Sequence, residues 1–118
     1  KLINLQSDIR NKFEKQKEKI YGFLYYDKNL EEAFNYSSEF VIKNFDNSKL
    51  ITLSLTDSDS IYYRIYLENG DDIRYEIFYN DQMNIAYSIY ENKKVKYSNY
   101  GNFDKMNQQI ILLKENLN

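Results

Sequence analysis

Two carboxylates, Glu68 and Glu76, lie among tyrosines and arginines in the stretch SIYYRIYLENGDDIRYEIFYN, which covers residues 60–80. Two carboxylates that face one substrate can hydrolyse a glycosidic bond, one as the acid and the other as the nucleophile or base. Charge pairing between strands is a simpler explanation, in which Glu76 contacts Arg64 or Arg74 and helps to fix the register. We therefore assign no catalytic residue.

Other catalytic chemistry is limited by the residue types that the chain lacks. It contains neither histidine nor cysteine, which excludes histidine-dependent triads and thiol nucleophiles. The usual nitrogen and sulfur ligands of zinc are missing for the same reason, so we expect no metal site. Three glycines are too few for a phosphate-binding loop or a dinucleotide fingerprint, and we expect no cofactor. The sequence predicts a protein that is not an enzyme.

The charge distribution argues against direct binding of nucleic acid. The net charge is −2, with +3 over residues 1–20, −8 over residues 21–91 and +3 over residues 92–118. A protein that binds the phosphate backbone usually presents a basic patch, and the lysines of the first segment are interpreted as a solvated helix face. Acidic turns that share one sheet edge would instead attract a basic protein. The candidate members of this acidic rim are Asp57, Asp59, Asp71, Asp72 and Asp81.

Helices are expected at both ends of the chain. Apolar residues recur at nearly helical spacing over residues 1–20, and a second helix is predicted from a cap at Asn29 to about residue 45. Between them, YGFLYYD predicts either a short strand or a packed connection. The pattern becomes helical again after Gly101, with Asn102 as the cap.

Between the helices, the apolar residues alternate with polar ones, which predicts strands. Asn69 and Gly70 indicate a hairpin turn in the centre of this region. The expected strands cover residues 50–56, 60–68, 72–79, 83–91 and 95–100. This order predicts an α+β fold in which the two N-terminal helices and one C-terminal helix cover an antiparallel meander sheet. The order of elements resembles the cystatin-like and NTF2-like architectures.

Length and composition set further limits. At 118 residues we expect one domain, residues 1–118. No apolar run approaches the roughly 18 residues that span a bilayer, so a membrane contact is expected only through residues before Lys1. Localisation stays open between cytoplasm and export. The abundance of Asn, Lys, Ile and Tyr indicates A/T-rich codons, as in a low-GC bacterium, phage or mobile element.

The tyrosines of the predicted sheet raise a separate question, since codon bias explains their number but not their placement. The period of two assigns several of them outward, beside arginines. Tyrosine and arginine are enriched at the energetic centres of protein interfaces. A helix on that side of the sheet would instead bury them. The predicted partner-binding residues are Tyr62, Arg64, Tyr66, Arg74, Glu76, Phe78 and Tyr90.

Two functions fit these features. The first is a small non-enzymatic protein-binding module, an inhibitor or immunity protein directed at a toxin or a nucleic-acid enzyme. The alternative is an exported or membrane-anchored accessory domain of cystatin-like or NTF2-like architecture. That domain would bind a peptide, a surface component or a second copy of itself as a homodimer.

Overall fold

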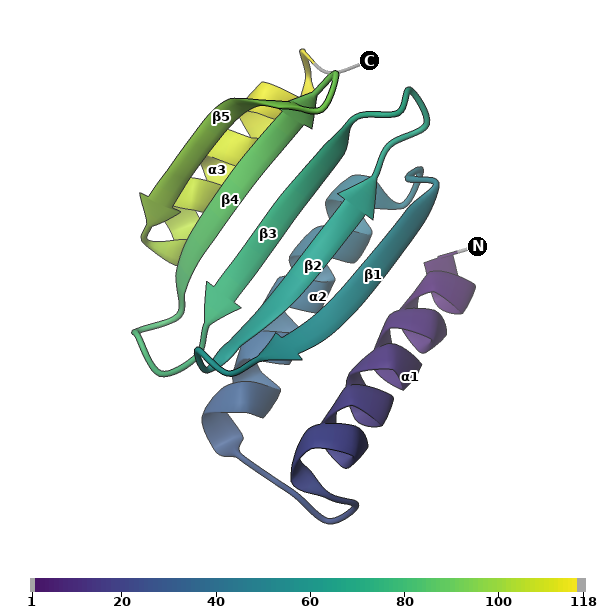
Figure 1. Ribbon diagram of the computed structural model, residues 1–118, viewed down its shortest axis with the longest axis vertical. Coiled ribbons are helices and arrows are strands. Elements are labelled where there is room, and N and C mark those ends of the chain that lie inside the picture. The colour runs from purple at the N-terminus through teal and green to yellow at the C-terminus, as the bar shows by residue number, and fades with distance from the viewer. Residues whose placement is uncertain (1, 117–118) are drawn as a thin grey trace.

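Within residues 2–116, three helices pack against one side of a five-stranded antiparallel sheet (Figure 1). The structure, a computed structural model, describes residues 2–116. The strands follow one another across the sheet in the order β1-β2-β3-β4-β5. The elements are α1 (Leu2–Tyr21), α2 (Lys28–Phe45), β1 (Leu50–Thr56), β2 (Ser60–Tyr66), β3 (Asp72–Phe78), β4 (Asn84–Glu91), β5 (Lys94–Gly101) and α3 (Phe103–Lys114). The predicted α+β meander is confirmed, with strand ends that agree within two residues.

The inward face of the sheet is the hydrophobic core. Alternate residues of β2 and β3 are fully buried there, and antiparallel pairing places Tyr63 opposite Tyr75 and Ile65 opposite Ile73. The predicted alternation of inward and outward residues is therefore confirmed in the central strands. Because side chains alternate across a strand, burying these residues under the helices sends the arginines and the remaining tyrosines to the other face.

The buried tyrosines tie the sheet to the helices through their hydroxyl groups. Tyr63 Oη lies 2.7 Å from Ser37 Oγ of α2, and Tyr75 donates to Asn107 Oδ1 of α3 at 2.9 Å. A buried hydroxyl needs such a partner, since leaving it unpaired is costly. Burial raises the pKa of both Tyr63 and Tyr75, although the hydrogen bonds to Ser37 and Asn107 act in the opposite direction.

The caps of α2 and α3 fix where these helices begin. Asn102 Oδ1 accepts a hydrogen bond from the Lys105 backbone at 3.2 Å, which confirms the predicted cap of α3. The predicted cap of α2 was wrong, because Asp27, and not Asn29, has the extended backbone of a cap, at φ −138° and ψ 119°. Asp27 Oδ1 accepts from the Leu30 backbone at 3.0 Å, and Asn29 lies inside the first turn.

The two edges of the sheet are protected in different ways. At β1, α1 supplies side chains to the open backbone, since Lys12 Nζ donates to Ile51 O at 2.6 Å and Gln16 Oε1 accepts from Leu55 N at 3.2 Å. At the other edge, β5 carries Lys94 and Lys96, and its pairing with β4 shifts register. Lysines and register irregularities discourage an unwanted strand from pairing with an edge.

None of the helices within residues 2–116 has the length and apolar character needed to cross a membrane. Within the same residues, no group of three or more acidic side chains is placed to hold a metal ion.

The buried tyrosines predict a loss of stability in alkali. Unfolded tyrosine ionises near pH 10, whereas the raised pKa keeps Tyr63 and Tyr75 protonated in the folded state. The stabilisation is complete below about pH 10 and is lost above it, by about 1.4 kcal/mol per pH unit for each buried tyrosine. Urea unfolding at a series of alkaline pH values measures this slope.

Tyr63→Phe should cost about 1 kcal/mol at neutral pH and make the alkaline slope shallower. Ser37 keeps a hydrogen bond to Ala33 O at 2.6 Å in this variant. Tyr26→Phe is the matched control, because Tyr26 is 70% exposed, and it should leave the slope unchanged. An equal slope in both variants would contradict the role assigned to Tyr63.

Candidate functional site

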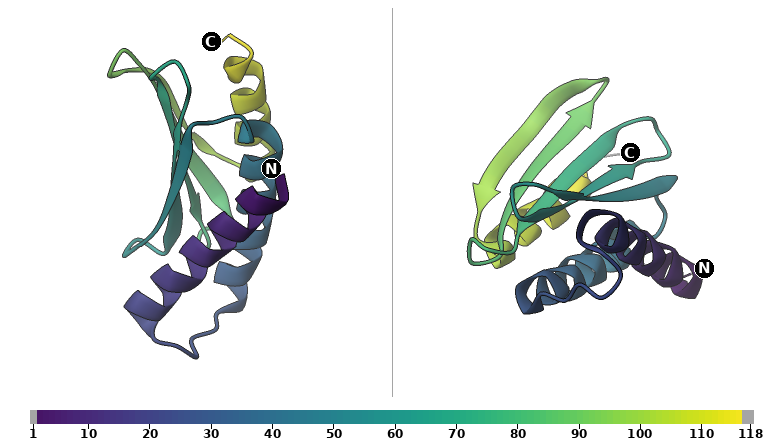
Figure 2. Two further views of the ribbon diagram at one scale, coloured as in Figure 1. Left: turned by 90° about the vertical axis from the view of Figure 1, so that its right-hand side faces the viewer. Right: turned by 60° about the horizontal axis from the view of Figure 1, so that its bottom comes forward.

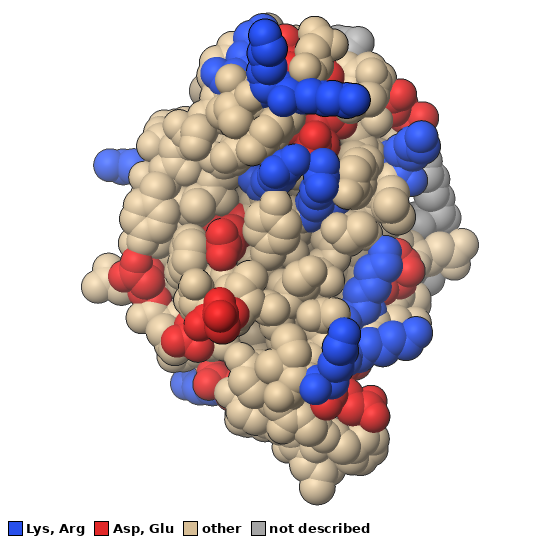
Figure 3. All heavy atoms as spheres, in the orientation of Figure 1, with Lys and Arg blue, Asp and Glu red and all other residues tan. Residues whose placement is uncertain are grey.

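One face of the sheet is left uncovered by the described helices. All three helices lie on the same side, as the left view of Figure 2 shows. Figure 3 shows the opposite side, where large uncharged areas separate small groups of basic and acidic side chains. The predicted partner-binding residues all lie on this open sheet face, which is the name used below for the outward side chains of β1–β5. They are half-buried by their neighbours on the face, and not by a helix.

The centre of the open sheet face is a pair of arginines that share one carboxylate. Arg64 of β2 and Arg74 of β3 are directly opposite each other. Both Nε atoms donate to Asp72 Oδ2, each at 3.1 Å. Like charges in opposite positions destabilise a sheet, so the shared Asp72, only 8% exposed, is needed to offset the repulsion. Burial alone would lower the pKa of Arg74, but the hydrogen bond and charge of Asp72 raise it overall.

This arrangement corrects the predicted pairing of Glu76. In the described structure Glu76 forms no ion pair with Arg64 or Arg74 and instead accepts a hydrogen bond from the Ser60 hydroxyl. Glu76 is opposite Tyr62, one row away from the two arginines, and Asp72 is opposite Tyr66, one row away on the other side. Both arginine side chains turn toward Asp72. The carboxylate of Glu76 therefore lies on the open sheet face beside the arginine pair, without neutralising it.

The two arginines rest on tyrosine rings. The guanidinium carbon of Arg64 is 4.8 Å from the ring centre of Tyr66, and that of Arg74 is 3.9 Å from the ring centre of Tyr90. A guanidinium over an aromatic ring is stabilised by the quadrupole of the ring. Among residues 4–116, neither arginine makes a hydrogen bond through its terminal Nη nitrogens. The guanidinium groups are thus oriented by Asp72 and the rings while their outer nitrogens stay available.

The other predicted members of the face lie beside this pair. Tyr62 is opposite Glu76 in the next row, and its pKa is raised by burial despite the nearby arginines. Phe78 contacts the ring of Tyr100, with the ring centres 5.9 Å apart. The two carboxylates considered for glycoside chemistry are not brought together, because Glu68 follows the end of β2 at the far end of the strand from Glu76.

The predicted acidic rim is divided between the two ends of the sheet. Asp57 and Asp59 lie in the β1–β2 turn and Asp81 lies in the β3–β4 turn, at the same end of the sheet (Figure 1). Asp71 lies in the β2–β3 turn at the opposite end. Asp72 is inside β3, where it serves the arginine pair. The end formed by the first three aspartates is called the acidic end below.

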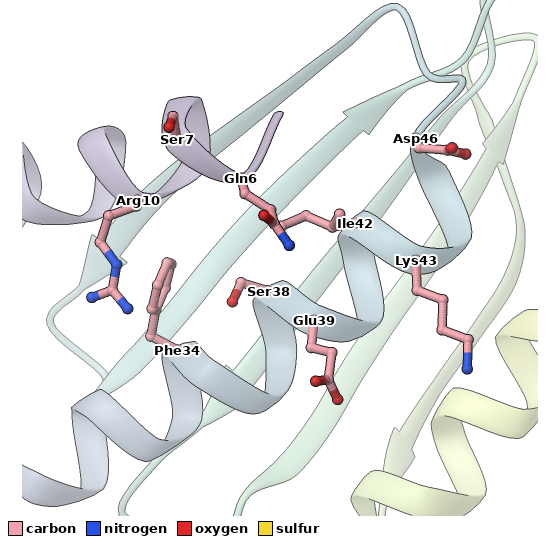
Figure 4. Close-up of a pocket in the computed structure, with 9 residues that line it drawn as sticks. All are labelled: Gln6, Ser7, Arg10, Phe34, Ser38, Glu39, Ile42, Lys43 and Asp46. Atoms are coloured by element: carbon pink, nitrogen blue, oxygen red, sulfur yellow. The ribbon is translucent and has the colours of Figure 1, made fainter. Parts of the chain in front are cut away.

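A groove of about 600 Å³ lies on the helical side, between α1 and α2 (Figure 4). Its most prominent cation, Arg10, packs over Phe34 at 4.5 Å and donates to Glu14 and Asn35. Figure 4 shows the side chains of Glu39 and Lys43 pointing away from α1. The polar groups of this groove do not converge on one point, so the open sheet face is the stronger candidate. The residues that line the groove between α1 and α2 are Gln6, Ser7, Arg10, Phe34, Ser38, Glu39, Ile42, Lys43 and Asp46.

The sequence did not predict that the loop between α1 and α2 exposes apolar side chains. Stacked rings of Tyr21 and Tyr25, 4.2 Å apart, pack against the core, which leaves Phe23 82% exposed and Leu24 86% exposed. Gly22 makes the turn at φ 103°. The aromatic composition of YGFLYYD indicated a packed segment, but it could not show which side chains face solvent. The alternative prediction of a strand there was wrong.

Removing the carboxylate that joins the two arginines should destabilise the fold. We expect Asp72→Asn to cost about 2 kcal/mol, less than the roughly 3–5 kcal/mol of a fully buried pair, because water screens the partly exposed arginines. Asp57→Asn changes the charge equally in an exposed turn and serves as the control. Urea unfolding at neutral pH compares the two variants. Equal stabilities would show that Asp72 does not hold the arginine pair.

No protein-family model matches the chain, and neither the curated proteins nor the solved structures contain a significant match.

Proposed function

We propose that this chain is a non-enzymatic protein-binding module that acts by forming a complex through its open sheet face. The observation that supports this proposal best is the arginine pair, in which each guanidinium lies on a tyrosine ring and keeps its outer nitrogens unpaired among the described residues. Arginine and tyrosine carry much of the binding energy in protein complexes.

Preorganisation favours binding at this surface. Long side chains usually lose conformational entropy when a partner fixes them. Arg64 and Arg74 are already held by Asp72 and by the rings of Tyr66 and Tyr90, so a partner orders them at a smaller cost. The tyrosines add contact area with few rotatable bonds. A partner laid across β2–β4 would therefore meet side chains that are largely in place.

The acidic end supports a basic partner, and we propose an inhibitor or immunity role against a toxin or a nucleic-acid enzyme. Asp57, Asp59 and Asp81 extend from neighbouring turns at one end of the sheet, and the whole chain has a net charge of −2. Proteins that act on nucleic acid carry basic surfaces, which such an acidic end attracts over a distance. In this proposal the charge speeds encounter, and the open sheet face supplies the lasting contacts.

Truncation of the face tests this function. The wild-type domain is used to purify its partner from the source organism, and the affinity of the purified partner is then measured by calorimetry. Arg64→Ala combined with Tyr66→Ala should raise the Kd at least about 100-fold, since each truncation of a central side chain typically costs about 2 kcal/mol or more.

The matched control removes the same kinds of group from the helical side. Tyr36→Ala combined with Lys43→Ala deletes one exposed tyrosine and one cation of α2 and should leave the Kd unchanged. Circular dichroism verifies that both double variants fold. If the face variant binds as tightly as the control variant, the open sheet face is not the interface.

A further inference from the structure

We propose that Arg64 and Arg74 together form a binding site for one carboxylate group, presented by an acidic side chain or chain terminus of the partner protein. This inference rests on the proposed function and specifies the chemistry of its central contact. It assigns the recognition to the terminal Nη nitrogens, because both Nε atoms are already bonded to Asp72 Oδ2.

The geometry of the pair suits two oxygen atoms. Arg64 and Arg74 are opposite residues of neighbouring antiparallel strands, so their side chains leave the sheet next to each other. Asp72 binds both guanidinium groups from the same side, at equal distances of 3.1 Å. A carboxylate that approaches from solvent can accept hydrogen bonds from both groups, in the planar manner that guanidinium favours.

The charge of the site matches a monoanion. Two guanidinium groups and one shared carboxylate leave a local charge of +1, which a single carboxylate neutralises. A polyanion such as nucleic acid would also meet Glu76 in the neighbouring row, and that carboxylate repels phosphates. Lys96 of β5 could add a cation, but it is paired with Glu91 at 3.0 Å. The charge pattern therefore favours a protein carboxylate over a phosphate backbone.

Aromatic rings border the site. The rings of Tyr66 and Tyr90 lie against the two guanidinium groups, on either side of Asp72 in the same row of the sheet. A partner that covers these rings would exclude water from the ion pair and strengthen it. Because a partner that covers these rings also covers the arginine pair, we place the carboxylate contact at the centre of the interface, where hot-spot residues cluster.

A second copy of this chain could also supply the carboxylate, from its Glu76. We assign the site to a different protein because Glu76 is half-buried and its carboxylate accepts a hydrogen bond from Ser60. Extending Glu76 to another copy would break this contact. Analytical ultracentrifugation separates the two sources, since self-association that Glu76→Gln abolishes would overturn the assignment to a different protein.

Nuclear magnetic resonance of the arginine side chains tests the site without the partner. The chain contains only three arginines, Arg10, Arg64 and Arg74, so their Nε–Hε signals can be assigned by single substitutions to lysine. Acetate is the probe, titrated at constant ionic strength against chloride. We expect saturable shifts for Arg64 and Arg74, whereas Arg10, on the helical side, should show only a small linear drift.

The variant Arg64→Lys with Arg74→Lys keeps both charges and removes the planar donors. Its backbone signals near β2 and β3 should respond more weakly to acetate, with an apparent affinity at least about fivefold lower than that of the wild type. Tighter saturation by inorganic phosphate than by acetate would overturn the choice of a carboxylate. If the signals of all three arginines in the wild type shift only linearly with acetate, the proposed site does not exist.

These results are distinct from a failure of the proposed function. If acetate does not saturate but truncation of Arg64 and Tyr66 still weakens the partner complex, the open sheet face remains an interface and the carboxylate assignment fails. If acetate saturates but truncation leaves the complex unchanged, the anion site stands as a property of the protein and the interface assignment fails.

Discussion

The alternation of side chains across the sheet is the constraint on which the other features depend. A shift of one residue between β2 and β3 would turn one of the two strands over, so that its inward side chains would face outward. If β2 turned over, Tyr63 would lose Ser37 and Arg64 would be forced under the helices without water. If β3 turned over, Tyr75 would lose Asn107 and Arg74 would be buried in the same way. The same register thus maintains the core and creates the binding surface, so neither can be changed alone.

Within that register, stability and recognition use different atoms of the same side chains. The Nε atoms of Arg64 and Arg74 bind Asp72, which offsets the repulsion of two cations on neighbouring strands. The terminal nitrogens take no part in this structural contact. Because different nitrogens serve the two roles, the two arginines are held next to each other in the free protein without a large loss of stability. Their terminal nitrogens stay available to a partner. A guanidinium group with all its nitrogens hydrogen-bonded within the protein would have to break one of these hydrogen bonds before it could bind a partner.

The sequence predicted the helices, the strands and the faces of the central strands, because alternation and caps are local signals. It did not predict which carboxylate joins the arginines. Glu76 and Asp72 are each two residues from Arg74, and only the direction of the side chains distinguishes them. It also assigned the α2 cap to Asn29 and not to Asp27, since either residue is a suitable acceptor and the choice depends on where the incoming loop turns. Long-range geometry was the missing information.

The contact between α1 and the edge of β1 means that the first helix protects this sheet edge as well as contributing to the core. Lys12 and Gln16 occupy backbone groups of β1 that another chain could otherwise use. The loop that exposes Phe23 and Leu24 joins α1 to the rest of the domain, and it is a typical target for a protease that cuts after large apolar residues. A single cut there followed by departure of α1 would turn an inert edge into a template for intermolecular sheet growth.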